Sequence, residues 1–186
     1  MLIYRSLEEV KPARKTVIAL GNFDGIHIAH QKILTRAVQD ARQFHALSVC
    51  FTFSNHTRNG VRRICSENEK LCLLQELGFD IVFNPVFDNK IKSLSPQGFI
   101  QTILHDRLKA LEVCCGFNYR FGAGAAGDVT YLKNACDVLG IRVFVQEAVM
   151  VEGQVVSSTE IRKLIQVRNF DYVKRLLGRE LIQTAR

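Results

Sequence analysis

The sequence predicts an α/β fold in which helices cover both faces of a parallel sheet. Two observations support this class. Short, apolar, β-branched runs alternate along the chain with segments whose apolar residues recur at helical spacing. The chain has 186 residues, 47% hydrophobic and 23% charged, which is enough to bury the core of one domain. We therefore expect a single domain over residues 1–186, with its ligands at the carboxyl ends of the strands.

The first half of the chain should supply strands at 16–20, 46–53 and 81–83, and helices at 31–44 and 67–77. The sequence TVIAL at 16–20 is apolar and β-branched, and we expect it to be the first strand. Ile33, Ala37 and Ala41 lie on one stripe of the first helix, as packing on a sheet requires. Gly78 should end the second helix.

The second half should begin with a helix opened by Ser95 and Pro96, because proline is accepted in the first turn. Further elements are expected as a strand at 111–115, a glycine-rich loop at 116–127, a helix capped by Asp128 and reaching about residue 139, a strand at 141–145, a short β segment at 148–156, and helices at 158–167 and 170–177. This order predicts a Rossmann-like, doubly wound sheet.

Composition excludes several classes of protein. The charged N-terminal segment does not resemble a signal peptide, and no apolar run approaches the roughly 18 residues of a membrane span, so we expect a cytoplasmic protein that binds no membrane. The six cysteines form no CxxC pair and are expected to be reduced core thiols. The net charge of +7 indicates an anionic partner, but no nucleic-acid-binding motif is present and we expect none to bind.

The turn from Gly21 to His30 reads GNFDGIHIAH and joins a strand to a helix, where such sheets bind nucleotides. Gly21 and Gly25 allow a sharp turn close to a ligand, and Asp24 can bond its own loop. The helix start offers free N–H groups to an anion. His27 and His30 should share one face, where two imidazoles can carry protons and offset charge on a phosphoryl group.

Two nearby histidines also have plainer explanations, as a partly buried pair or as metal ligands. A metal is the weaker alternative, because no third ligand lies nearby in the sequence and the zinc-binding helix pattern separates its histidines by four residues. The chain contains no GxxxxGK[ST], which excludes a Walker-type P-loop. The absence of GxGxxG from the turn disfavours a dinucleotide-binding dehydrogenase.

A second candidate anion site spans Ser157 to Arg162 and reads SSTEIR at the start of a predicted helix. Its three hydroxyls and the helix N-terminus could hold a phosphate, with Arg162 adding a forked cation. The structural alternative is a helix cap, because Ser157 followed by Glu160 is a capping box. Glu160 would also bring negative charge towards a bound phosphate.

Two further segments follow predicted strands. The loop from Gly116 to Asp128, GFNYRFGAGAAGD, could wrap a flat ring and a phosphate, or could be a connection whose aromatic side chains seal the core. The segment from Phe51 to Asn59, FTFSNHTRN, carries a histidine and an arginine and, taken alone, indicates a solvated loop.

Together these segments resemble, in order and spacing, the adenylyltransferase module of prokaryotic, ribF-type FAD synthetases. The resemblance covers nearly the whole chain. It includes the GNFDGxHxxH turn, the FxFxxHxR segment, Phe87-Asp88, Ser93 to Pro96, the GFNYRFG loop, the SSTxIR segment and Leu176 to Arg179. Such enzymes normally carry a C-terminal riboflavin kinase module, whereas this sequence ends seven residues after Arg179, so we expect the adenylyltransferase activity alone.

The resemblance implies a nucleotidyltransferase that moves AMP from ATP to the phosphate of FMN, forming FAD and pyrophosphate with Mg²⁺ required. A phosphate monoester with a second pKa of about 6 is largely a dianion at neutral pH, so the nucleophile needs no general base. Such a site aligns two anions and stabilises charge on the α-phosphorus.

The resemblance also implies roles for individual residues. The catalytic set is His27, His30, Asn118 and Arg162. ATP binding falls to Gly21, Asn22, Phe23, Asp24, Gly25, His27, His30, Ser157, Ser158, Thr159 and Arg162. FMN binding falls to Phe53, His56, Arg58, Asn118, Tyr119, Arg120 and Asp128, and the flavin ring could also meet Phe23, Phe117 or Phe121.

Several positions depart from the family pattern. Ala29 replaces the glycine of HxGH, Asn55 and Thr57 replace the two prolines around His56, and basic residues are missing at Ala123, Ala125, Val155 and Glu160. These changes remove positive charge from the expected anion site. They keep two alternatives open: another mononucleotide adenylyl- or cytidylyltransferase, and a non-catalytic or weakened flavin- or nucleotide-binding homologue.

Overall fold

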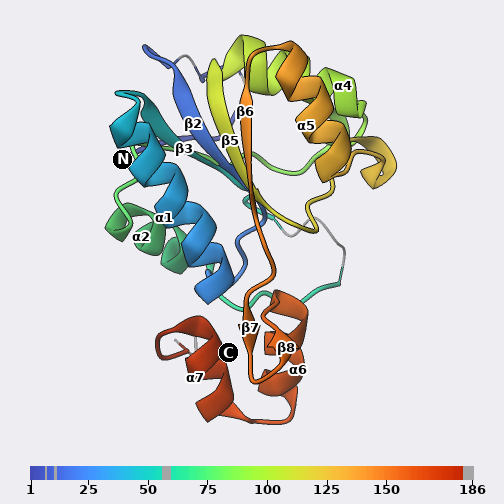
Figure 1. Ribbon diagram of the computed structural model, residues 1–186. Coiled ribbons are helices and arrows are strands. Elements are labelled where there is room, and N and C mark those ends of the chain that lie inside the picture. The colour runs from blue at the N-terminus through green and yellow to red at the C-terminus, as the bar shows by residue number, and fades with distance from the viewer. Residues whose placement is uncertain (7, 11, 56–59, 182–186) are drawn as a thin grey trace.

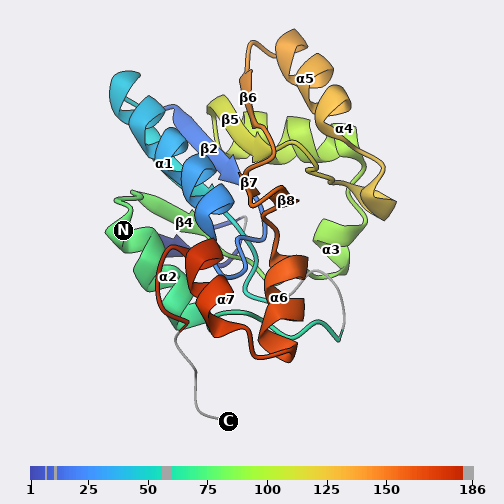
Figure 2. The same cartoon turned by 60° about the horizontal axis from the view of Figure 1, so that its bottom comes forward.

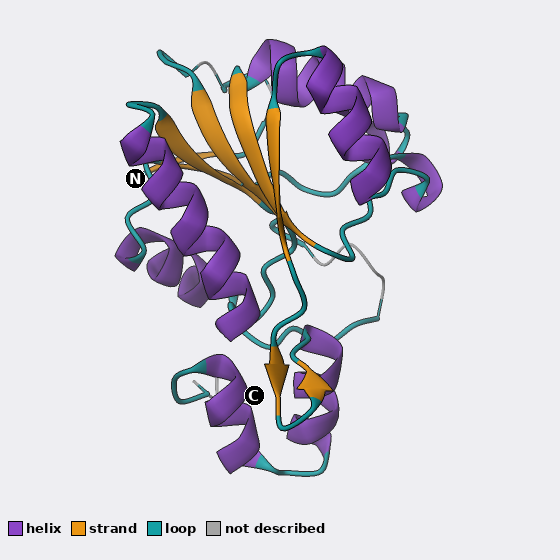
Figure 3. Ribbon diagram, in the orientation of Figure 1, coloured by secondary structure: helices purple, strands orange, loops and turns teal. Residues whose placement is uncertain are grey.

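The computed structural model describes residues 1–6, 8–10, 12–55 and 60–181. Within these ranges, the strands form one six-stranded sheet in the order β1-β4-β3-β2-β5-β6 and one two-stranded hairpin (Figures 1 and 3). All neighbours in the larger sheet are parallel. The strands are β1 Leu2–Tyr4, β2 Thr16–Leu20, β3 Leu47–Phe51, β4 Ile81–Phe83, β5 Ala110–Gly116, β6 Arg142–Gln146, β7 Met150–Val151 and β8 Gln154–Val155.

Helices lie between these strands and after the last of them. They are α1 Ile28–Gln43, α2 Glu67–Glu76, α3 Asn89–Lys92, α4 Pro96–Gly98, the π-helix η1 Phe99–Arg107, the 3₁₀ turn η2 Ala123–Ala125, α5 Val129–Val138, α6 Ser158–Gln166 and α7 Phe170–Leu177. The caps expected from the sequence are present, because Ser95 accepts from the N–H of Gly98 and Asp128 accepts from that of Tyr131. The predicted α/β class is confirmed.

Four element predictions need correction. Residues 16–20 form the second strand and not the first, because Leu2–Tyr4 is a strand that pairs with β4 at the sheet edge. The sequence did not predict this strand, since three partly exposed residues are too few to show an alternating apolar pattern. The strand expected at 46–53 ends at Phe51. Helix α1 begins at Ile28, three residues before the predicted start, because the His27 side chain caps it. The segment 148–156 is a hairpin that turns at Gly153, where φ is +77°.

The sheet separates two apolar layers (Figures 1 and 3). One layer joins β2, β3 and β4 to α1 and α2, and the other joins the opposite face to η1 and α5. From β2 the chain proceeds outward through β3 and β4, then returns to place β5 on the other side of β2. The topological switch point therefore lies between β2 and β5, where ligands of doubly wound sheets bind.

Helices α6 and α7 and the β7–β8 hairpin lie beyond the carboxyl ends of the strands (Figures 1 and 2). Their apolar cluster includes Ile161 and Leu176 and reaches Ile64 and Ile28. Gln31 of α1 donates a hydrogen bond to the carbonyl of Leu177 at 2.8 Å. These contacts fasten the last helices against the turn that precedes α1.

The cysteines are free thiols, and five of the six are buried as predicted. Cys72 is exposed on α2, so the expectation of core burial is wrong at this position. Among the described residues, no helix combines the length and apolar character that crossing a membrane requires.

A buried carboxyl pair joins α1 to the other end of the sheet. Asp40 pairs with Arg36, and Glu112 with Arg142 at 3.4 Å. Glu112 also accepts from the Cys114 thiol at 3.6 Å. Burial, followed by the neighbouring Asp40 carboxylate, raises the pKa of Glu112 to about 7.

This raised pKa gives a testable pH dependence. The folded chain holds a proton on Glu112 that the unfolded chain has released, so its stability should fall as pH rises from about 4.5 to about 7. We expect Glu112→Gln to remove this loss of stability. The melting temperature of the variant minus that of wild type should therefore be larger at pH 8 than at pH 5. Thermal melts at the two pH values test this, and the same difference at both would contradict it.

Candidate active site

The turn after β2 has an unusual backbone. Phe23 and Ile26 are buried and have φ of +47° and +37°, a region that side-chain-bearing residues rarely adopt. Gly25 has φ +81°, and a Cβ there would lie 2.8 Å from Ile64. The surrounding structure therefore holds the turn in a conformation that it would not adopt alone.

Asp24 is the centre of this arrangement. Its buried carboxylate accepts from the backbone N–H of Ile64 at 3.0 Å and of Cys65 at 3.5 Å, and it pairs with Arg162 at 2.5 Å. The expectation that Asp24 bonds its own loop is therefore wrong. The turn is covered by residues 64–65, whose N–H groups lack a strand or helix partner and need an acceptor.

The second candidate anion segment meets the turn at Asp24. Ser158 donates its hydroxyl to the Asp24 carbonyl at 2.9 Å, and Arg162 also donates to the carbonyl of Arg62 at 2.8 Å. Ser157 caps α6 by accepting from the N–H of Glu160 at 3.2 Å, as the capping box predicts. Thr159 is exposed. Two of the three hydroxyls thus have structural partners.

His27 and His30 lie together at the start of α1. Their rings stack with centroids 3.6 Å apart and planes 16° apart, and Phe23 meets His30 edge to face. His27 Nδ1 accepts from the backbone N–H of His30 at 3.3 Å. Within the described part of the chain, the buried Nδ1 of His30 has no hydrogen-bond partner.

Both imidazoles are neutral at pH 7. Burial lowers the pKa of His27 to about 4, and burial together with His27 and Lys70 lowers the pKa of His30 well below its usual range. A neutral His27 whose Nδ1 accepts a hydrogen bond carries its proton on Nε2. The prediction that this pair shares one face agrees with the structure, but in the free protein the pair adds no positive charge.

The glycine-rich loop leaves β5 beside this turn. Phe117 and Asn118 are exposed at the strand end, and Tyr119 stacks on buried Phe121 with centroids 5.6 Å apart. Arg120 pairs with Asp128 across the loop at 3.7 Å. Polar and aromatic side chains of the loop therefore face solvent near the switch point, while Phe121, like Phe23 of the turn, belongs to the core.

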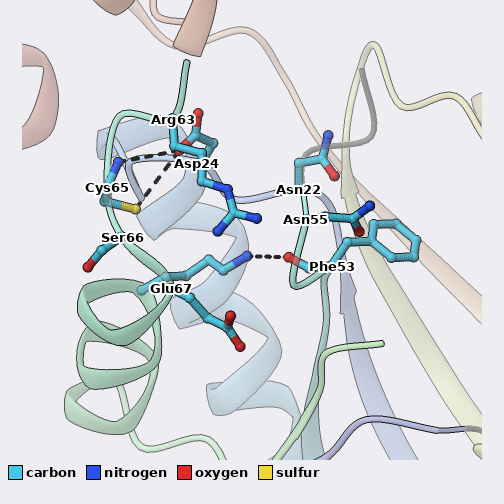
Figure 4. A pocket seen from close by; sticks show the side chains of 9 residues that line it. Asn22, Asp24, Phe53, Asn55, Arg63, Cys65, Ser66 and Glu67 are labelled. Carbon is cyan, nitrogen blue, oxygen red and sulfur yellow. Dashed lines mark hydrogen bonds between the residues drawn. The ribbon is translucent and has the colours of Figure 1, made fainter. Parts of the chain in front are cut away.

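The segment after β3 forms the other wall (Figure 4). Phe53 is half-buried against Phe51 and Phe87, and Asn55 accepts from the N–H of Phe87 at 2.6 Å. The predicted FMN-binding residues His56 and Arg58 lie outside the described residues.

A small cavity of about 20 Å³ lies between this wall, the turn and the start of α2 (Figure 4). Side chains that sequence reasoning missed line it: Arg63, Cys65, Ser66, Glu67 and Lys70. One signal was available, because Lys70 is four residues before buried Leu74 and therefore shares its inward face.

These groups suit the binding of anions better than covalent catalysis. Burial raises the pKa of the Cys65 thiol to about 11, which keeps it protonated and poorly nucleophilic at neutral pH. A helix start, neutral imidazoles and cations surround the switch point. This arrangement can align phosphates and stabilise developing negative charge.

The chain is similar to proteins of one known family. The sequence pattern of the FAD synthetase family matches residues 9–160. The bifunctional riboflavin kinase/FMN adenylyltransferase of Pseudomonas fluorescens is 31% identical over 186 residues, covering 96% of this chain and 60% of the relative. The protein of the same name from Escherichia coli K12 is 29% identical over 173 residues, covering 90% of this chain and 55% of the relative.

A solved structure described as the macrolide-efflux protein of Streptococcus pneumoniae superposes with a TM-score of 0.85 at 26% identity. The match covers 97% of this chain and 60% of that one. The chain therefore spans about three fifths of the length of these longer proteins, and the shared fold extends over nearly all of it. Given the family pattern that spans residues 9–160, this chain belongs to the FAD synthetase family.

Proposed function

We propose that this chain transfers AMP from ATP to the phosphate of FMN, forming FAD and releasing pyrophosphate. The observation that carries the proposal is the meeting of the Gly21–His30 turn and the Ser157–Arg162 segment at Asp24, beside the switch point. These segments are more than 120 residues apart in the sequence. Membership of the family and the names of the relatives support the same reaction.

The histidines would act as hydrogen-bond donors. With Nδ1 of His27 accepting from the helix start, the Nε2–H of this ring is the donor that remains for a phosphate oxygen. An arriving anion favours protonation, so the low pKa of both rings should rise when ATP binds. The pair would then offset the charge that accumulates as pyrophosphate departs.

Arg162 would contribute first by holding the turn. Its guanidinium pairs with Asp24, so any phosphate that it contacts must share this cation with a carboxylate. We therefore assign Arg162 the role of fixing the turn for the triphosphate, in addition to attracting anions. Ser158 would serve the same purpose through the Asp24 carbonyl.

The FMN-binding part of the site would lie between the glycine-rich loop and the segment after β3. Exposed Phe117 and half-buried Tyr119 and Phe53 offer aromatic faces for the isoalloxazine. Asn118, in the loop just after β5, is the polar side chain that we assign to orienting the reacting phosphate. Arg120, paired with Asp128, would attract the anion through its exposed face.

Magnesium would arrive with ATP. Mg²⁺ in nucleotide sites is commonly held by one or two carboxylates together with substrate phosphates. Asp24 is the carboxylate at the turn, and both of its oxygens already accept from Arg162 and residues 64–65. Asp24 therefore does not fit a resident magnesium site at this turn, and we propose that the metal is bound by the triphosphate and water as part of the substrate.

We further propose that residues 1–186 act as one adenylyltransferase domain in the cytoplasm. The apolar cluster of α6 and α7 extends to Ile28 and Ile64, which supports a single catalytic unit.

The direct test is to incubate the purified chain with FMN, ATP and Mg²⁺ and to measure FAD and pyrophosphate by chromatography. We expect both products in equal amounts, and a fall of at least about 10-fold in kcat/KM for His27→Ala, because a donor to the phosphates is lost. His45→Asn is the matched control, since His45 is exposed beyond the far end of α1. Binding of FMN or ATP without FAD formation would instead support a non-catalytic homologue.

A further inference from the structure

Lys70 is a buried cation beneath the nucleotide turn. It lies on α2, and only 6% of its surface is exposed. Its Nζ donates to the carbonyl of Phe53 at 2.8 Å, the bond that ends on Phe53 in Figure 4, and to the hydroxyl of Thr52 at 3.1 Å. The ammonium group therefore lies at the carboxyl end of β3, where ligands of this fold bind.

Lys70 forms no ion pair with a carboxylate in the described part of the chain. Asp24 is paired with Arg162, and the Glu67 carboxylate accepts from Arg5 and Asn84. Burying an ammonium without a counter-ion is costly, and an anion bound nearby would offset that penalty. An anion bound near Lys70 would therefore be stabilised by this charge.

Lys70 is also connected to the turn through Thr52. This fully buried threonine receives the Lys70 hydrogen bond and donates its own hydroxyl proton to the carbonyl of Asn22 at 2.9 Å. Asn22 is the second residue of the turn. The position of its peptide therefore depends on a relay that begins at the Lys70 ammonium.

The other basic side chains of the nucleotide site supply little free positive charge, so the Lys70 ammonium can contribute it. His27 and His30 are neutral in the free protein, and Arg162 is paired with Asp24. A cation already in place beneath the turn would supply positive potential before any histidine is protonated.

We propose that Lys70 is a positioning residue for the ATP phosphates: it fixes the Asn22 peptide through Thr52 and provides the positive charge that attracts the triphosphate. This inference rests on the proposed function and goes beyond it by adding a residue on α2 to the nucleotide site. It does not require Lys70 to touch the reacting atoms.

The proposal predicts a pH dependence. Burial lowers the pKa of Lys70, and the titratable groups that face it are Asp24 of the turn, Arg63 of the loop before α2, Cys50 of β3, Cys65 and His30. ATP affinity should be full while Lys70 is charged. It should decline as pH rises through this lowered pKa, and Lys70→Met should lose the decline.

Calorimetric binding of ATP to the full chain provides the main test, because it does not depend on FAD formation. We expect Lys70→Met to raise the Kd for ATP by about 10-fold at pH 7.5, the effect of losing one charge-assisted interaction. Lys32→Met is the matched control, since Lys32 is exposed on α1 and should leave the Kd unchanged. Thr52→Val should weaken binding by a smaller factor, and Thr52→Ser should restore it.

Thermal melts separate positioning from simple structural support. Methionine replaces an unpaired buried charge by an apolar chain of similar length, so we expect a melting temperature within a few degrees of wild type. The proposal would be overturned by an unchanged Kd for Lys70→Met, or by a wild-type chain that does not bind ATP. Weaker binding would also overturn it if Lys70→Met and Thr52→Val both failed to fold. Wild type that binds ATP but makes no FAD would refute the proposed function, and the ratio of Kd values would still decide the role of Lys70.

Discussion

Asp24→Asn should lower the free energy of unfolding by about 3 kcal/mol and reduce FAD formation at least about 10-fold. The substitution keeps one acceptor for the N–H of Ile64 but removes the charge that faces Arg162 at 2.5 Å. Arg162 is only 21% exposed, so its largely buried guanidinium would lose the charge of the Asp24 carboxylate. The turn and α6 would then lose the ion pair between Asp24 and Arg162.

Urea denaturation and steady-state FAD formation at pH 7.5 measure the two effects. Glu160→Gln is the matched control, because this carboxylate lies on α6, as Arg162 does, but pairs at 3.5 Å with Lys163, which is 68% exposed. A pair of this kind contributes about 0–1 kcal/mol. Equal losses for Asp24→Asn and Glu160→Gln would show that Asp24 is not the centre of the site.

Gly25→Ala should destabilise the chain by about 2–4 kcal/mol, the second large effect. About 1–2 kcal/mol of this comes from placing a Cβ at φ +81°, and the rest from crowding. The new methyl carbon would lie 2.8 Å from Ile64 Cγ2 and 3.1 Å from Ile64 Cβ, a contact that requires backbone movement. Because residue 64 also bonds Asp24, the displacement should reach the nucleotide turn and lower activity.

Gly153→Ala isolates the backbone contribution. Gly153 has φ +77° in the β7–β8 hairpin, but a Cβ there meets nothing within 4 Å. We expect this variant to lose only the conformational part, about 1–2 kcal/mol, and to keep its FAD synthesis. Similar losses of stability and activity in the two variants would contradict the crowding against Ile64.

Local pattern was sufficient for most of the fold. The apolar runs at 16–20 and 81–83 are strands, and Asp128, Ser95 and Ser157 cap helices, because each signal depends on neighbours within four residues. The edge strand Leu2–Tyr4 escaped prediction because its pairing with β4 lies almost 80 residues away. Three residues are too few to show the alternating pattern of a strand, and local sequence does not reveal a partner strand so far along the chain.

For the candidate site, the sequence by itself determined which residue types gather at the switch point: the glycines and histidines of the turn, the hydroxyls and arginine of residues 157–162, and the family to which they belong. Only the tertiary structure decided their charges and partners. Burial makes His27 and His30 neutral, Asp24 binds Arg162 across more than 130 residues, and Lys70 is buried beneath the turn. Protonation and pairing depend on desolvation and on distances between segments remote in sequence, and neither quantity is encoded in local spacing.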